Sequence, residues 1–415
     1  MIPLSPKQRF QTKNFASNFF VKIVLLILGI IYVISSFLPK HADFWIFNTL
    51  ASRYWLDPLH FYQNELSTAL YPPLLPATFY AIQGIWYNLG SYILHYNFID
   101  FYHVTGASIT IYYFWAMLPT LAALFLFVTL AYFVLNRKWV SIICFGSITF
   151  ISVQIMGQID IFCVLFIFIS AILFMRALKS DNYYSLSILG FLSLGVSMQF
   201  KTYGALLFPL FILSTLAISK VKKLDLVNSI LLIVIGSTFF IIATFIVWIP
   251  YPGMFGKLIL GGESQWTLYY TIFDGISIWL LGMIILIYFI VREIFQNPQR
   301  FLDDERYYFF YIFIIIVWFF ISVRTLPQFW MLLVPAMLFV LDKFNVKWGI
   351  WLCGLIILLF VFFPFSSQFH IAQNLELLHI PVIYLDTKMS TILITGIAGI
   401  LIIWAFELKK SLLND

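Results

Sequence analysis

Charged residues are scarce in this chain: Asp, Glu, Lys and Arg make up 10% of its 415 residues, while hydrophobic residues make up 62%. No polar stretch is long enough to fold as a separate soluble domain. A helix needs about 20 apolar residues to cross the hydrocarbon core of a bilayer, and apolar runs of this length recur along the chain. The sequence therefore predicts a polytopic, all-α membrane protein with a single domain over residues 1–415.

Cysteine is also rare, and Cys144, Cys163 and Cys353 all fall in apolar stretches without paired spacing. This pattern indicates neither a disulfide framework nor a zinc site. The sequence also lacks the GxxxxGK[ST] pattern of phosphate-binding loops, the HExxH pattern of zinc proteases and the GxSxG pattern of serine hydrolases. No motif therefore requires a cofactor.

The positive charge of the chain does not indicate a nucleic-acid partner. The net charge is +6, but the Lys and Arg residues lie in short segments between apolar runs. Cytoplasmic loops of membrane proteins carry such an excess of positive charge. We therefore attribute the charge to membrane topology and predict no nucleic-acid binding.

Twelve membrane spans are predicted from hydropathy and length. The predicted spans are 21–38, 109–135, 139–156, 161–178, 184–200, 203–219, 227–249, 272–291, 307–323, 327–342, 347–364 and 389–408.

A further apolar stretch, residues 72–94, is long enough to cross, and the positive charges decide its placement. With the N-terminus in the cytoplasm, twelve spans leave 18 of the 24 Lys and Arg residues on the cytoplasmic side. A thirteenth span would place most of them outside, against the usual bias. We therefore predict that 72–94 lies along, or dips into, the outer interface, as part of a first outer loop over residues 39–108 with interfacial helices.

The first outer loop opens with His41-Ala42-Asp43-Phe44, and Asp43 is the first candidate for chemistry. Phe44 and Trp45 follow it, and apolar neighbours at a membrane surface favour proton uptake by a carboxylate. Asp43 is therefore a candidate general base. A solvated loop residue is the alternative.

A second carboxylate lies in Gly157-Gln158-Ile159-Asp160, a short turn between two apolar runs. This spacing places Asp160 at membrane depth or at its rim. Ionisable groups at that depth are costly and usually face an interior cavity. Asp160 is therefore a candidate catalytic residue, with the N-cap of the following helix as the alternative.

Six cations are predicted on the outer side, against the overall charge bias, and two of them are candidate ligands of a phosphate. Lys201 follows one outer helix end, and Arg324 precedes Leu326-Pro327-Gln328-Phe329. A lysine can snorkel to the interface without any ligand, but both cations are also suited to bind a phosphate. Glu263, His370 and His379 lie in outer loops and are weaker candidates.

These motifs, in this order and on one side of the membrane, resemble the GT-C class of integral membrane glycosyltransferases. The resemblance is closest to bacterial relatives of the GPI mannosyltransferases, with echoes of the dolichol-dependent glucosyltransferases. It rests on five segments: His41–Phe44, Tyr71-Pro72-Pro73-Leu74, Gly157–Asp160, Lys201 to Pro209, and Arg324–Phe329.

The resemblance implies transfer of a hexose, mannose-like, from a polyprenyl-phosphate sugar to a glycan, lipid or protein acceptor. The site would face the outer or lumenal side of a bacterial plasma membrane or of the ER membrane. Asp43 and Asp160 would be catalytic. Asp43 has no adjacent carboxylate, so a divalent cation stays an open question. Substrate binding would fall to His41, Tyr71, Gln158, Lys201, Glu263, Arg324 and Gln328.

Two other functions fit an outer groove with polar residues. A transporter or flippase of lipid-linked sugars would need the same groove, but it would also need ionisable groups near the bilayer midplane. A noncatalytic partner subunit of a glycosyltransferase would share the architecture without the chemistry. The clustering of polar residues on one side favours the enzyme.

Overall fold

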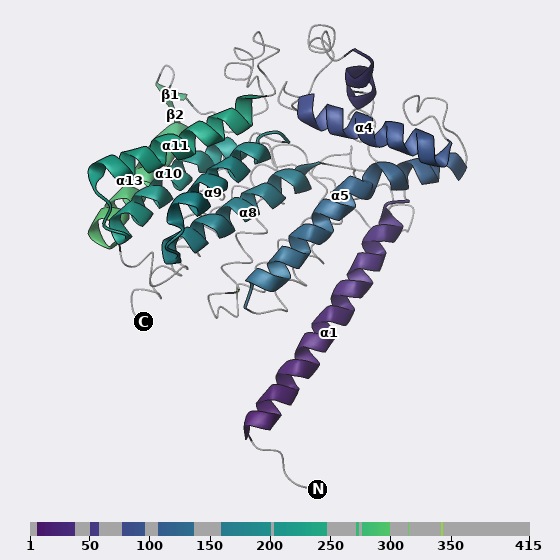
Figure 1. The fold of residues 1–415 in the computed structure, drawn as a ribbon, viewed down its shortest axis with the longest axis horizontal. Helices are drawn as coiled ribbons and strands as arrows, with labels where there is room; N and C mark the ends of the chain where they lie inside the picture. Colours follow the sequence, from purple (N-terminus) through teal and green to yellow (C-terminus); the bar gives the residue numbers. More distant parts are fainter. Residues whose placement is uncertain are drawn as a thin grey trace.

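A computed structural model describes residues 6–37, 50–57, 77–95, 107–136, 159–200, 203–246, 271–273 and 276–298, together with Ile314 and Asp342. The described chain is helical apart from two short strands (Figure 1). Its elements in chain order are α1 (Pro6–Ser35), α4 (Ala77–Leu94), α5 (Ala107–Val134), α8 (Asp160–Lys179), α9 (Tyr183–Ser197), α10 (Tyr203–Val221), α11 (Leu226–Phe245), β1 (Thr271–Phe273), β2 (Ile276–Ser277) and α13 (Ile278–Gln296).

Three helical segments are long and apolar enough to cross a membrane: Thr110–Val134 of α5, the whole of α8, and the whole of α11. Shorter apolar helices occupy Phe19–Ser35, Tyr183–Ser197 and Leu207–Val221. The prediction of an α-helical chain with membrane-length helices is therefore confirmed for the described residues. Predicted spans 139–156, 307–323, 327–342, 347–364 and 389–408 lie outside them, except for Ile314 and Asp342.

One predicted span begins differently in the structure. The sequence predicts a span over 272–291, whereas α13 begins only at Ile278 and residues 271–277 contribute the antiparallel strands β1 and β2. Thr271 pairs with Ser277, and Phe273 pairs with Ile276. The sequence between the strands is Asp274-Gly275, a pair that favours tight hairpin turns. The predicted start of this span was therefore wrong.

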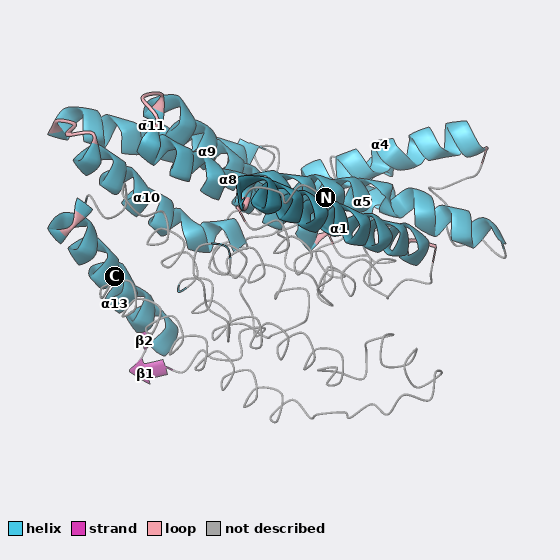
Figure 2. Cartoon of the chain, turned by 90° about the horizontal axis from the view of Figure 1, so that it is seen from below, coloured by secondary structure: helices cyan, strands magenta, loops and turns pink. Residues whose placement is uncertain are grey.

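The helices α8, α9, α10 and α11 form a bundle in which consecutive helices run antiparallel, while α9 and α11 pack side by side in parallel (Figures 1 and 2). Serine hydroxyls tie α8 to α9: Ser170 Oγ donates to the Gly190 carbonyl at 2.7 Å, and Ser193 Oγ donates to the Phe166 carbonyl at 2.8 Å. Small residues and interhelical hydrogen bonds are the usual means of joining helices in a membrane, where burial of apolar surface supplies little drive.

A close contact between helices is made at Gly195 of α9. A Cβ atom at this position would lie 2.7 Å from the Phe240 carbonyl oxygen and 2.7 Å from the Ala243 Cβ atom of α11. A backbone atom cannot move aside as a side chain can. The lack of a side chain at Gly195 therefore sets how closely α9 and α11 approach.

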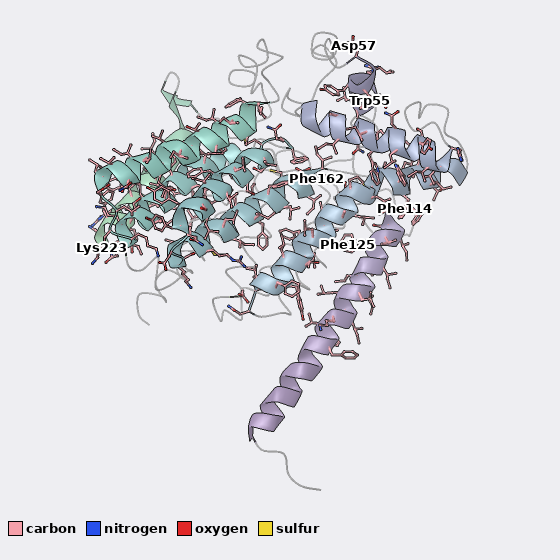
Figure 3. All side chains as sticks on the ribbon, in the orientation of Figure 1. Trp55, Asp57, Phe114, Phe125, Phe162 and Lys223 are labelled. Atoms are coloured by element: carbon pink, nitrogen blue, oxygen red, sulfur yellow. The ribbon has the colours of Figure 1, made fainter. Side chains whose placement is uncertain are left out.

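The bundle has two chemically different ends. At one end, α8 begins where α9 finishes, and the Phe162 and Phe200 rings stack with centroids 4.9 Å apart. At the other end, the Lys222 ammonium lies 3.6 Å from the Asp181 carboxylate. Figure 3 places the labelled residues Phe162 and Lys223 at opposite ends of the bundle. We call these the Asp160 end and the basic end.

Helices α4, α5 and α1 pack at the other side of the molecule (Figure 2). The indoles of Trp86 and Trp115 stack with centroids 4.5 Å apart, and each donates a hydrogen bond to the carbonyl oxygen of the other residue. Pro119 lies inside α5, where it removes a backbone hydrogen bond, and the helix bends in Figure 1. The α4 helix crosses the beginning of α5 instead of running alongside it.

The surface of α4 is apolar where a water-facing helix would be polar. Gln83 and Tyr87 point inward and share a hydrogen bond of 2.6 Å, and burial raises the pKa of the Tyr87 phenol above its usual value. The exposed side chains are large and apolar. They are Ile82, Ile85, Leu89, Tyr92 and Ile93. Polar side chains that face the protein and apolar side chains that face outward are typical of a helix in contact with lipid.

Candidate functional site

Asp160 is the one predicted site residue that falls among the described residues, and it is the first residue of α8. The helix cap is Ile159, whose carbonyl oxygen accepts a hydrogen bond from the Phe162 backbone N–H at 3.1 Å. The alternative reading of Asp160 as the N-cap is therefore wrong, because Asp160 already belongs to the first helical turn. A carboxylate at this position is stabilised by the helix dipole by about 0.3–1 kcal/mol.

Asp160 is fully buried, with 0% of its surface exposed. Ile161, Cys163 and Val164 in the same two helical turns are also buried. Removing a carboxylate from water is costly, and the helix dipole offsets only a small part of that cost. Buried ionisable groups in such surroundings are functional candidates by default. Asp160 therefore remains the candidate that both the sequence and the structure favour.

A stack of phenylalanine rings brings the end of α9 to the start of α8. The Phe200 ring stacks on Phe162 at 4.9 Å and on Phe166 at 5.9 Å between centroids. Phe200 directly precedes Lys201 in the chain. The chain therefore reaches the predicted phosphate-binding lysine from the Asp160 end of the bundle, although Lys201 itself lies outside the described residues.

Gln199 is a residue at this end that sequence reasoning missed. It is 5% exposed, and its Nε2 group donates to the carbonyl oxygens of Ala243 and Thr244, the latter at 2.9 Å. The last carbonyl groups of a helix have no partner within the helix. Gln199 satisfies two of them at the C-terminal end of α11 and ties this end to α9. The signal in the sequence that could have identified Gln199 is a polar residue between the apolar residues Met198 and Phe200.

The remaining predicted site residues lie outside the described part of the chain. They are His41, Asp43, Tyr71, Gln158, Lys201, Glu263, Arg324 and Gln328. Their proximity to Asp160 therefore stays a prediction. Among the residues that the structure describes, no group of three or more His, Cys, Asp and Glu side chains is placed to hold a metal ion.

Comparison of the chain with protein-family models, curated proteins and solved structures finds no match. The fold and the site together define an α-helical protein with membrane-length helices and a carboxylate buried at one end of its main bundle. The resemblance to GT-C glycosyltransferases therefore stays an expectation from the order of short motifs in the sequence.

Proposed function

We propose that this protein is a membrane glycosyltransferase that transfers a hexose from a polyprenyl-phosphate sugar to an acceptor on the outer or lumenal face. The observation that best supports this proposal is the burial of Asp160 at the bundle end from which the chain reaches Lys201. A buried carboxylate is a common feature of functional sites, and the proposal adds Lys201 as the cation that binds the lipid phosphate. In this proposal the site is at the end of the bundle opposite its basic residues.

The proposed reaction is a direct displacement at the anomeric carbon of the donor sugar. The acceptor oxygen forms a bond to this carbon, and the bond between the carbon and the phosphate oxygen breaks. Asp43 takes the proton from the acceptor hydroxyl, and Asp160 orients the acceptor or donor. Lys201 and Arg324 stabilise the negative charge that remains on the departing lipid phosphate.

The distribution of ionisable residues favours an enzyme over a transporter. Within the described helices α5, α8, α9, α10 and α11, every Asp, Glu, Lys, Arg and His residue lies close to a helix end. A transporter that moves a charged lipid phosphate across the bilayer is expected to carry such groups near its midplane. An enzyme that transfers a sugar needs its ionisable residues only at one surface of the membrane.

The first test is transfer by the purified chain in a bilayer, with a panel of polyprenyl-phosphate sugars and mass-spectrometric detection of the product. Asp160→Asn nearly preserves the shape of the side chain and removes its charge. We expect it to lower turnover by about a hundredfold, because a reactant displaced by about 1 Å from its productive position can lose this much in rate. Asp181→Asn is the matched control, because Asp181 is exposed at the basic end.

Each other outcome of this assay contradicts the proposal in a different way. Movement of the lipid-linked sugar across the bilayer without transfer indicates a transporter. Transfer only after a partner chain is added, unaffected by Asp160→Asn and Asp43→Asn, indicates a noncatalytic subunit. Equal turnover by Asp160→Asn and Asp181→Asn would mean that transfer does not need the Asp160 carboxylate, so the burial of Asp160 would no longer support the proposal.

A further inference from the structure

The basic end of the bundle carries more positive charge than its carboxylates neutralise. Lys and Arg residues gather where α8 and α10 end, and two Asp residues accompany them in the connecting turns. The cations are Arg176, Lys179, Lys220, Lys222 and Lys223, and the carboxylates are Asp181 and Asp225.

One of the two carboxylates is already committed to the helix that follows it. Asp225 is the N-cap of α11: its Oδ1 atom accepts from the Asn228 backbone N–H at 2.7 Å, and its Oδ2 atom accepts from the Asn228 side chain at 3.0 Å. Asp181 lies 3.6 Å from Lys222, which also lies over the Tyr183 ring. This pair joins the turn after α8 to the turn after α10 and so brings the two groups of cations together.

The backbone at Lys223 has an unusual conformation for a lysine. Its φ angle is 54°, in the left-handed region that favours glycine. The Leu224 N–H donates to the Ser219 carbonyl at 2.9 Å, and the Lys223 N–H donates to the Lys220 carbonyl at 3.3 Å. These two bonds form a Schellman motif, in which glycine is the usual residue at the position of Lys223. Strain of this kind is often found where a side chain has a function.

The surroundings of Lys223 indicate a lipid ligand and not a soluble polyanion. Leu226 and Val227, one turn further along the chain, are 75% and 73% exposed. Lys223 is itself exposed, and within the described part of the chain its ammonium has no carboxylate partner. Exposed apolar side chains directly beside exposed cations mark the level where hydrocarbon meets headgroups.

We infer that the basic end binds the phosphate of anionic phospholipid headgroups, with the exposed Lys223 as the principal contact. This inference depends on insertion of the chain in a bilayer and not on glycosyl transfer. Positive charge on cytoplasmic loops directs insertion, but that role ends once the protein is folded. A headgroup site predicts, in addition, that anionic lipid stabilises the folded protein, because a ligand that binds only the native state raises its apparent stability.

The test compares the full chain in nanodiscs of phosphatidylcholine alone and in nanodiscs that also contain phosphatidylglycerol. We expect phosphatidylglycerol to raise the midpoint of thermal unfolding and to be retained after transfer to detergent, as counted by native mass spectrometry. Lys223→Gln should lower this retention about fivefold, as expected for about 1 kcal/mol per lysine near an anionic surface. Arg53→Gln, which removes an exposed cation outside the basic end, should leave retention unchanged.

Lys223→Gly gives a second measurement whose sign differs from that of a simple structural defect. Glycine relieves the left-handed backbone, so this variant should unfold at a higher temperature than the wild type in phosphatidylcholine. The same variant should gain less from phosphatidylglycerol. A generally damaged protein would be less stable in both lipids.

Three results would overturn the inference. The first is an unfolding midpoint that does not respond to phosphatidylglycerol. The second is an equal loss of retention in Arg53→Gln, which would indicate nonspecific attraction to the charged surface. The third is full stabilisation in phosphatidylcholine by added glycerol phosphate, which would make free phosphate the ligand. None of these results changes the outcome of the transfer assay.

Discussion

At the scale of single residues, Asp160 is notable for its burial and Lys223 for its backbone conformation, and neither property follows from the residue type. Asp160 is a carboxylate in apolar surroundings, held by the first turn of α8. Lys223 is an ordinary exposed lysine in a backbone conformation that favours glycine. The sequence drew attention to Asp160 because a charged residue between two apolar runs is conspicuous. Lys223 was counted only as one positive charge of a cytoplasmic loop, because backbone angles cannot be derived from charge patterning.

The sharpest prediction at this scale concerns Asp43. We expect Asp43→Asn to abolish transfer while the protein stays folded and still binds the donor. The substitution is nearly isosteric, and a positioned base contributes on the order of a hundredfold to ten-thousandfold in rate. Turnover and equilibrium binding of the lipid-linked sugar should be measured on the same preparation.

The variants Lys201→Ala and Arg324→Ala provide the contrast for Asp43. They remove the two proposed phosphate contacts, so donor binding should weaken, and transfer should slow because charge grows on the leaving phosphate in the transition state. Near-normal turnover by Asp43→Asn together with loss in Asp160→Asn would reverse the two carboxylate roles. Normal turnover by both Asp43→Asn and Asp160→Asn would contradict the proposal that this protein is an enzyme with these catalytic residues.

At the scale of secondary-structure elements, the sequence predicted three long apolar helices of the described part of the chain well. The described helices α5, α8 and α11 all lie within a few residues of their predicted bounds. The prediction failed at residues 271–277, where apolar strand residues beside Asp274-Gly275 have the same hydropathy as a helix start. Gln199 was missed for another reason: its partners on α11 are more than 40 residues away, and hydropathy carries no information on pairing.

The contact between α9 and α11 gives a prediction on stability. Gly195→Val places branched carbon atoms against the Phe240 carbonyl and Ala243, so the two helices must separate. Overpacking of this kind typically costs about 1–3 kcal/mol, and we expect a lower unfolding midpoint in mild detergent. Gly84→Ala is a less severe control, because the nearest atom to a Cβ at Gly84 lies 3.0 Å away and belongs to the Trp55 side chain. Equal stability of Gly195→Val and the wild type would mean that the helices do not approach this closely.

At the scale of the whole molecule, the two ends of the bundle provide a consistent chemical polarity. The Asp160 end holds the buried carboxylate and the aromatic stack, and the basic end holds exposed cations beside exposed apolar side chains (Figure 3). The sequence predicts that the Lys and Arg residues of the basic end lie on the cytoplasmic side. The two proposals therefore assign the enzyme site and the headgroup site to opposite faces of the membrane.

This separation makes membrane topology the prediction on which both proposals depend. Single cysteines at Gln63 and Gln158 should react with a membrane-impermeant thiol reagent added outside, and a cysteine at Lys222 should react only after the membrane is opened. Cysteines at Leu70 and Tyr96 should both be labelled from outside, because α4 is then an interfacial helix and not a span. Labelling of Leu70 and Tyr96 from opposite sides would make α4 a true span. Labelling of Lys222 from outside would place the basic end on the outer face and would contradict the sidedness of the proposed glycosyltransferase site.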